Sequence, residues 1–180
     1  MEIVAQILSI LSCAGIILSF QLKNNRHLFL VQTIAALGFG ISYLLLGAID
    51  GFLINVVCFT NTAILLNKKL KKTPILIVIC ASFIIISTIS VLTYNGDWGM
   101  MKILETTFSY LIAIAQIIYT ITTWKDDGGK IRKMRLFFVT PAWLGYNIVV
   151  FSIGGIICEA FNIISIIVSF IRYGKNGFEK

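Results

Sequence analysis

Seven apolar runs divide the chain, and polar or charged residues separate each run from the next. The runs lie at about Ile3–Leu22, Leu28–Ile49, Phe52–Leu66, Pro74–Leu92, Ile103–Thr123, Leu136–Phe151 and Ile156–Ile171. A hydrocarbon core about 30 Å thick needs roughly 20 helical residues to cross it, and about 17 is the lower end. The pattern therefore predicts an all-α integral membrane protein with seven transmembrane helices, of which the third and sixth are short.

The basic residues predict the orientation of these helices. Fourteen of the fifteen Lys and Arg residues fall at one set of helix ends, and Lys102 is the exception. The clusters are Lys23 and Arg26, then Lys68, Lys69, Lys71 and Lys72, then Lys125, Lys130, Arg132, Lys133 and Arg135, then Arg172, Lys175 and Lys180. Because Lys and Arg concentrate in cytoplasmic loops, we expect the amino terminus outside and the carboxy terminus inside, which requires seven crossings.

The composition excludes a soluble domain and argues against nucleic acid as a partner. The 180 residues are 58% hydrophobic and only 13% charged, whereas soluble domains are about half apolar and a quarter charged. A net charge of +7 is compatible with nucleic-acid binding, but here the charges form short clusters beside apolar runs. That arrangement is typical of cytoplasmic loops that face anionic membrane lipid.

The first three runs resemble the last three. The run Ile49-Asp50-Gly51 aligns with Ile153-Gly154-Gly155 at an offset of 104, which places Asn55 over Glu159. Both units start outside, so they are predicted to be parallel repeats, with three-helix bundles at residues 1–72 and 102–180 and a linker helix with its outer loop at 73–101. Parallel repeats related by an axis along the membrane normal are a known plan of transporters, whose substrate site lies near mid-membrane.

Polar residues inside the spans are the candidates for function, because a charge at the bilayer centre costs at least ~2.5–3.5 kcal/mol. Glu159 leads a stripe at helical spacing that includes Asn162, and Asn55 leads a similar stripe in the third span. We expect Glu159 and Asn55 to face each other and bind a polar substrate, or a proton on Glu159 to couple to transport. The alternative is a neutral or hydrogen-bonded Glu159 near a helix start, where the helix dipole favours an acid.

The fifth and sixth spans supply the other candidates. Gln116 belongs to a polar stripe of the fifth span. We expect this stripe to bind a solute, and the alternative is that it only joins helices through hydrogen bonds. Pro141 lacks an amide hydrogen and loosens the helix before it. A kink there would direct Trp143 to stack on a substrate and Asn147 to hydrogen-bond it, and the alternative is an ordinary packing kink. Gln32 and Tyr43 on the second span are expected to serve as polar contacts between helices.

No pattern of catalytic or metal-binding residues occurs. His27 is the only histidine, and the four cysteines, Cys13, Cys58, Cys80 and Cys158, have no paired spacing. Intramembrane chemistry needs a nucleophile with a base, paired acids or several metal ligands in one site. We therefore expect no enzymatic activity, no cofactor and no metal.

The stretch from Trp143 to Glu159, with Asn147 and the run Ser152-Ile-Gly-Gly inside it, resembles the YgjV-type bacterial inner-membrane proteins. The inner loop from Lys23 to Phe29 and the region from Gly38 to Gly47 are similar as well. The resemblance implies a multi-pass protein of the bacterial cytoplasmic membrane. This family is in turn distantly similar to the SWEET, PQ-loop and PnuC transporters, which implies two bundles in a seven-helix fold and transport of a small solute. The Pro-Gln dipeptide of the PQ-loop members is absent.

The sequence thus predicts a transporter or facilitator of a small polar metabolite, such as a sugar, vitamin or nucleoside, that works by alternating access. Its predicted substrate site comprises Asn55, Gln116, Trp143, Asn147, Glu159 and Asn162. The alternative is a non-transporting membrane protein that handles lipid, acts as a receptor or binds a partner. The basic segments Lys68–Lys72 and Lys125–Arg135 are expected to be solvated loops near anionic lipid. The solute, the coupling ion and any homo-oligomer are not determined by the sequence.

Overall fold

The computed structural model describes residues 2–174, except for the side chain of Lys68. Lys175 and Lys180, which belong to the last predicted basic cluster, lie outside the described residues. All the regular elements within residues 2–174 are helical: α1 Glu2–Gln21, α2 Asn25–Leu45, α3 Ile49–Leu66, a short 3-10 helix η1 at Lys68–Leu70, α4 Thr73–Thr93, α5 Met100–Trp124, α6 Gly128–Met134, a π-helix η2 at Arg135–Val139, α7 Thr140–Val149 and α8 Ile153–Tyr173.

Local side chains fix several helix starts. Asn24 accepts a hydrogen bond from the Arg26 amide at 2.8 Å in front of α2, and Ser152 accepts one from the Gly155 amide at 3.3 Å in front of α8. Asp127 caps α6 by accepting from the Lys130 amide at 3.0 Å, and this bond holds the pKa of the Asp127 carboxyl below its usual value. Each bond satisfies an amide that has no partner inside the helix.

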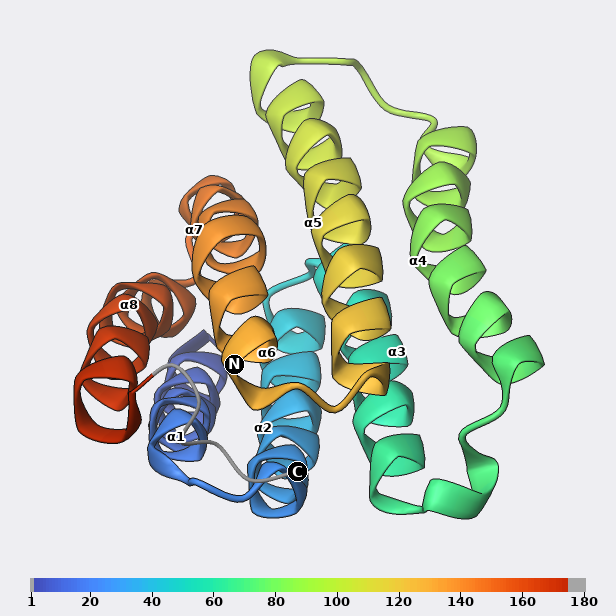
Figure 1. Ribbon diagram of the computed structural model, residues 1–180. Coiled ribbons are helices and arrows are strands. Elements are labelled where there is room, and N and C mark those ends of the chain that lie inside the picture. The colour runs from blue at the N-terminus through green and yellow to red at the C-terminus, as the bar shows by residue number, and fades with distance from the viewer. Residues whose placement is uncertain (1, 175–180) are drawn as a thin grey trace.

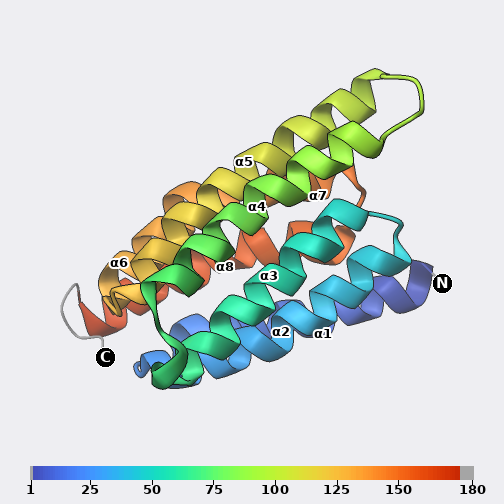
Figure 2. The same ribbon diagram turned by 90° about the vertical axis from the view of Figure 1, so that its right-hand side faces the viewer.

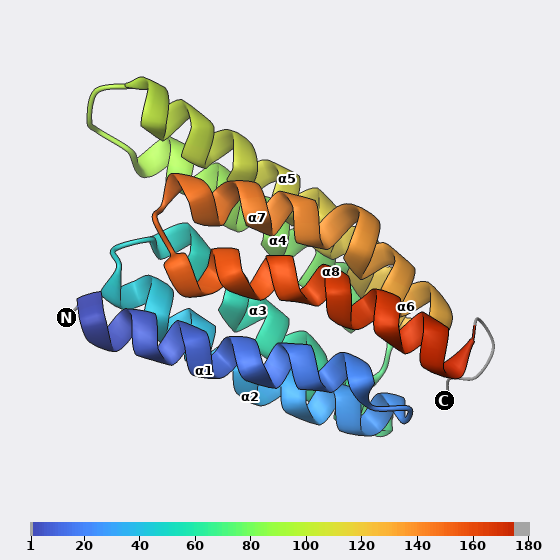
Figure 3. The same ribbon diagram turned by 90° about the vertical axis from the view of Figure 1, so that its left-hand side faces the viewer.

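The helices lie side by side as long rods, and α1 begins and α8 ends at opposite ends of the bundle (Figures 2 and 3). α2 packs between α1 and α3, and α7 packs between α5 and α8. The two groups meet where α1 contacts α8 and where α3 contacts α5. α4 lies at the edge of the molecule, against α3 and α5 (Figure 1). The other rods therefore form a closed ring with α4 outside it.

Six helices are long and apolar enough to cross a membrane, namely α1, α2, α3, α4, α5 and α8. The expected sixth span, Leu136–Phe151, is instead divided among α6, η2 and α7, which follow one another without a gap from Gly128 to Val149. The boundary between the second and third spans was also misplaced. α2 ends at Leu45 and Ile49 already belongs to α3, because Gly47 takes a positive φ of 76° that ends the helix.

Pro141 explains why the expected sixth span is not one regular helix. It has no amide hydrogen to donate to the carbonyl one turn earlier. The amide of Thr140 donates to the carbonyl of Arg135, five residues back, so the turn before the proline is widened into a π-helix. The predicted kink is thus a π segment, and the rod continues through it.

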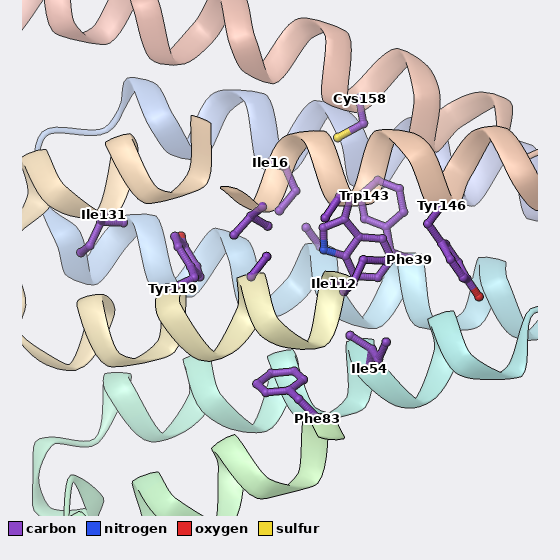
Figure 4. Packing of buried hydrophobic residues seen from close by; sticks show 14 of the residues in the cluster. Ile16, Phe39, Ile54, Phe83, Ile112, Tyr119, Ile131, Trp143, Tyr146 and Cys158 are labelled. Atoms are coloured by element: carbon purple, nitrogen blue, oxygen red, sulfur yellow. The ribbon is translucent and has the colours of Figure 1, made fainter. Parts of the chain in front are cut away.

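Apolar side chains fill the inside of the ring and also cover its outside. Figure 4 shows Ile16, Phe39, Ile112 and Trp143 gathered between the helices, with Tyr119 toward one end and Tyr146 toward the other. α4 is exposed over most of its length, with Ile77, Val78 and Leu92 among its exposed residues. Such a surface is suited to contact with lipid.

Candidate functional site

A cavity of about 70 Å³ lies inside the ring, and both polar and apolar residues line it. It is lined by Ile16 of α1, by Gln32, Ala36, Phe39 and Tyr43 of α2, by Asn55, Cys58, Asn61 and Thr62 of α3, by Gln116 and Tyr119 of α5, by Arg135 of η2, by Trp143 and Asn147 of α7, and by Gly155 and Glu159 of α8. We call it the central cavity. Helices that precede α4 and helices that follow it both contribute.

Five of the six residues predicted from the sequence line the central cavity: Asn55, Gln116, Trp143, Asn147 and Glu159. The sixth, Asn162, does not line it but donates a hydrogen bond from Nδ2 to Glu159 Oε2 at 3.1 Å. Asn55 and Glu159, which the repeat alignment matched, therefore lie at the same cavity. The structure brings the predicted set together.

A buried ion pair forms one wall of the central cavity. Arg135 Nη2 lies 2.7 Å from Glu159 Oε1, and the two side chains are only 11% and 5% exposed. Together with the bond from Asn162, this contact engages both oxygens of Glu159. The expectation that Arg135 is a solvated loop charge is wrong, because η2 directs this residue into the cavity.

Arg132 is the second basic residue that the sequence placed in a solvated loop. Its side chain is fully buried and donates to three backbone carbonyls: Gly128 at 3.1 Å, Phe20 at 3.4 Å and Leu22 at 2.7 Å. These bonds tie α6 to the last turn of α1. Two of the basic residues in Lys125–Arg135 are therefore inside the protein and not available to lipid.

The amides of the cavity are partly satisfied by neighbouring hydroxyls. Tyr43 donates to Asn147 Oδ1 at 2.5 Å, and Tyr119 donates to Gln32 Oε1 at 3.2 Å. Within residues 2–174 the side chain of Gln116 makes no hydrogen bond, although it is only 4% exposed. The cavity wall thus keeps polar groups that a solute can bind.

The family model Imp-YgjV, described as bacterial inner membrane protein, matches residues 3–177. The chain belongs to the Imp-YgjV family. Membership places the protein in the bacterial inner membrane, in agreement with its six apolar helices. No curated protein and no solved structure matches the chain, so the likeness of this YgjV-family protein to SWEET and PnuC transporters stays a prediction.

Three aromatic rings pack together at the central cavity in the YgjV-family protein, and those of Tyr43 and Trp143 line it. Tyr43 stacks on Trp143 with ring centres 5.6 Å apart, and Tyr146 packs edge-on against both at 6.0 and 5.9 Å. The Tyr146 hydroxyl also accepts a hydrogen bond from the Gly51 amide at 3.0 Å. A β-carbon at residue 51 would collide with the rings of Tyr43 and Tyr146, which explains the glycine there. We call Tyr43, Trp143 and Tyr146 the aromatic layer.

A second cavity, of about 270 Å³, lies between α3, α4 and α5. Asp50, Tyr94, Lys102 and Glu105 are among its lining residues. Lys102 Nζ lies 3.1 Å from Glu105 Oε2 and 4.8 Å from the centre of the Tyr94 ring. Glu105 lies on α5 like Gln116, but it is part of a separate charged cluster. Within residues 2–174 no group of three or more His, Cys, Asp or Glu side chains is placed to hold a metal ion.

Arg135 is the main residue of the site that the sequence analysis missed. A signal was present, because Arg135, Val139, Trp143 and Asn147 follow one another in steps of four residues. In a regular α-helix each such step drifts about 40° around the axis. The wider turn of η2 offsets part of that drift and lets Arg135 line the same cavity as Trp143 and Asn147.

Proposed function

We propose that this YgjV-family protein is a transporter or facilitator of a small polar solute in the bacterial inner membrane. In this proposal α1, α2 and α3 form one unit, and α5, the α6–α7 rod and α8 form the other. The α6–α7 rod provides a seventh crossing, and α4 connects two parallel units. Rocking of the units about the central cavity gives alternating access to the two sides of the membrane.

The buried pair of Arg135 and Glu159 is the observation that carries the proposal. Two charges in a membrane protein have a high desolvation penalty, and well-packed apolar residues are often as stable or more stable in their place. A purely structural contact between η2 and α8 therefore has no need of this pair. Ionisable groups that face the interior of a helix bundle typically mark substrate and proton pathways.

The aromatic layer fits the role of a barrier in such a cycle. Tyr43 belongs to the first unit, and Trp143 and Tyr146 belong to the second, so relative motion of the units would separate the rings. Tyr43 and Trp143 line the central cavity, while Tyr146 lies near Asp50 and Glu105 of the second cavity. Parting of the layer would connect the two cavities toward the side that we predict to be outside.

The test begins with ligand identification in detergent. Purified protein is screened by thermal shift against sugars, nucleosides, vitamins, amino acids and small carboxylates, because a ligand of the folded state raises the melting temperature. Each ligand found is then offered to sealed proteoliposomes. We expect uptake by the wild-type protein, and at least a tenfold reduction for Asn147→Ala, which removes an amide from the cavity.

Asn95→Ala is the matched control for Asn147→Ala, because Asn95 is an exposed amide residue in the loop between α4 and α5. Uptake by this variant should equal that of the wild type. Binding of a solute without uptake would support a receptor instead of a transporter. A folded protein that neither binds nor moves any solute of the screen would refute the transport proposal.

A further inference from the structure

The chemistry of the central cavity identifies the class of solute more narrowly. Resting on the proposed transport function, we infer that the central cavity takes a small monocarboxylate anion, which binds Arg135 while Glu159 accepts one proton. The carboxylate replaces Glu159 as the partner of the guanidinium. When the anion leaves, the proton leaves Glu159 and the ion pair forms again. One anion and one proton then move together, and the site stays neutral throughout.

The first argument is the distribution of unused hydrogen-bonding groups. Glu159 already accepts bonds on both oxygens, from Arg135 and from Asn162. Arg135 has capacity left, because its Nε atom is buried and has no hydrogen-bond partner among residues 2–174. Asn147 uses only its Oδ1 atom, so its amide nitrogen has no bonding partner within the same residues. The spare atoms of Arg135 and Asn147 are thus donors. Asn162 Oδ1 is a buried acceptor without a partner among residues 2–174, but Asn162 does not line the central cavity. A carboxylate is the group that supplies acceptors to a guanidinium with matching geometry.

The second argument is charge balance. Arg135 and Glu159 together carry no net charge, and they are almost completely buried. An anion that binds Arg135 would leave a carboxylate on Glu159 with no cation beside it. Isolated charges in such surroundings are so unfavourable that the group takes up a proton instead. Protonation of Glu159 is therefore the direct consequence of anion binding at Arg135.

Other titratable groups surround the pair without competing for that proton. They are Tyr43 on α2, Cys13 on α1, Cys158 on α8, Tyr119 on α5 and Cys58 on α3, and Arg132 interacts electrostatically with Tyr119. Between about pH 5 and pH 8 the tyrosine phenols are neutral and arginine keeps its charge. Glu159 is the carboxyl group of this set, and in this proposal the proton binds to it.

The third argument is size. A water molecule needs about 10–15 Å³ of such cavity space, so the central cavity of about 70 Å³ holds roughly five water-sized groups. Acetate and lactate have a comparable number of non-hydrogen atoms. A sugar or a nucleoside is larger and would have to part the aromatic layer.

The experiment measures equilibrium binding of radiolabelled acetate, lactate and pyruvate to detergent-purified protein between about pH 5 and pH 8. If one proton binds with each anion, the Kd rises about tenfold per pH unit once Glu159 is ionised in the free protein. Glu159→Gln leaves Arg135 without its anionic partner, so its affinity should not vary with pH. At about pH 8 it should exceed the wild-type affinity at least tenfold. Arg135→Gln should bind none of the three anions, and Arg26→Gln, which alters an exposed arginine, should match the wild type.

Infrared difference spectra provide an independent signature. Addition of lactate to the wild-type protein should produce the carbonyl band of a protonated carboxylic acid, and Glu159→Gln should lack that band. A structural role of Glu159 alone predicts neither the band nor the gain in affinity. Acetamide, which is uncharged and similar in shape to acetate, should give no band.

Three outcomes would overturn the inference. The first is that none of the three anions binds the wild-type protein at about pH 5. The second is that they bind with an affinity independent of pH. The third is that alanine, which is zwitterionic, binds in their place without proton uptake. Its carboxylate would then bind Arg135 and its ammonium group would bind Glu159, so that no proton is needed. In each case proteoliposome uptake of another solute would keep the transport proposal intact, and its absence would count against that proposal separately.

Discussion

At the scale of residues, the protein buries two opposite charges in the interior of its helix bundle, where a single unpaired charge would be strongly destabilising. Glu159 is held by Arg135 at 2.7 Å and by Asn162 at 3.1 Å. Its position therefore differs from the alternative in which a helix start alone stabilises the acid. Each charge of the pair therefore depends on the other for its burial.

A double-mutant cycle on the pair tests that dependence. Arg135→Gln leaves Glu159 buried without a cation, and we expect it to lower the free energy of unfolding by about 3–5 kcal/mol. The double variant Arg135→Gln with Glu159→Gln removes both charges and should recover most of that loss. The measurement is chemical unfolding in detergent micelles, with Arg26→Gln as the control. Losses that simply add in the double variant would show that the two side chains do not interact.

At the scale of elements, the π-helix η2 connects a local sequence feature to the site. Pro141 prevents a regular turn, and the widened turn before it carries Arg135 on one side. π-Helical turns inside α-helical rods occur frequently at functional sites. Here the turn orients a basic side chain, because it directs Arg135 of the α6–α7 rod toward Glu159.

Replacement of Pro141 by alanine tests this role of η2. Alanine restores an amide hydrogen, which favours a regular α-helix through this segment and rotates Arg135 relative to Trp143. We expect Pro141→Ala to stay folded but to lose at least tenfold in solute uptake. Pro74→Ala is the control, because Pro74 lies at the start of α4 and causes no distortion there. Equal uptake by both variants would show that the π-helical turn η2 is not needed for transport.

At the scale of the whole molecule, the ring of rods and the outer α4 require the chain to cross the membrane an odd number of times if all the rods span it. α1 begins and α8 ends at opposite ends of the bundle (Figure 3). Combined with the basic clusters, this arrangement predicts an external amino terminus and a cytoplasmic carboxy terminus.

Cysteine labelling in intact cells tests the orientation. In a variant without the four native cysteines, a cysteine introduced at Asp97, in the loop between α4 and α5, should react with a maleimide that cannot cross membranes. A cysteine introduced at Lys71, between α3 and α4, should react only after the cells are permeabilised. Reaction of both in intact cells would contradict the predicted topology.

Much of the fold and most of the residues that line the central cavity could be predicted from the sequence. Polar residues inside apolar runs are costly in contact with lipid, so they are expected to face the interior of the bundle. Asn55, Asn147 and Glu159 were assigned to a common interior on that basis, and all three line the central cavity. Arg135 and Arg132 were not found, since a basic residue at the end of an apolar run resembles a solvated loop charge. The tertiary contacts with Glu159 and with the end of α1 show that both residues are buried.

The contacts of Arg132 bear on how the protein would open at that end. One guanidinium holds the carbonyls of Phe20 and Leu22, which end α1, together with that of Gly128, which begins α6. α1 and α6 fall in different units of the proposed mechanism, so Arg132 holds the two units together at this end. Any motion that separates the two helices must break the bonds to Phe20 and Leu22, so water must bind these two carbonyl oxygens before a passage can form.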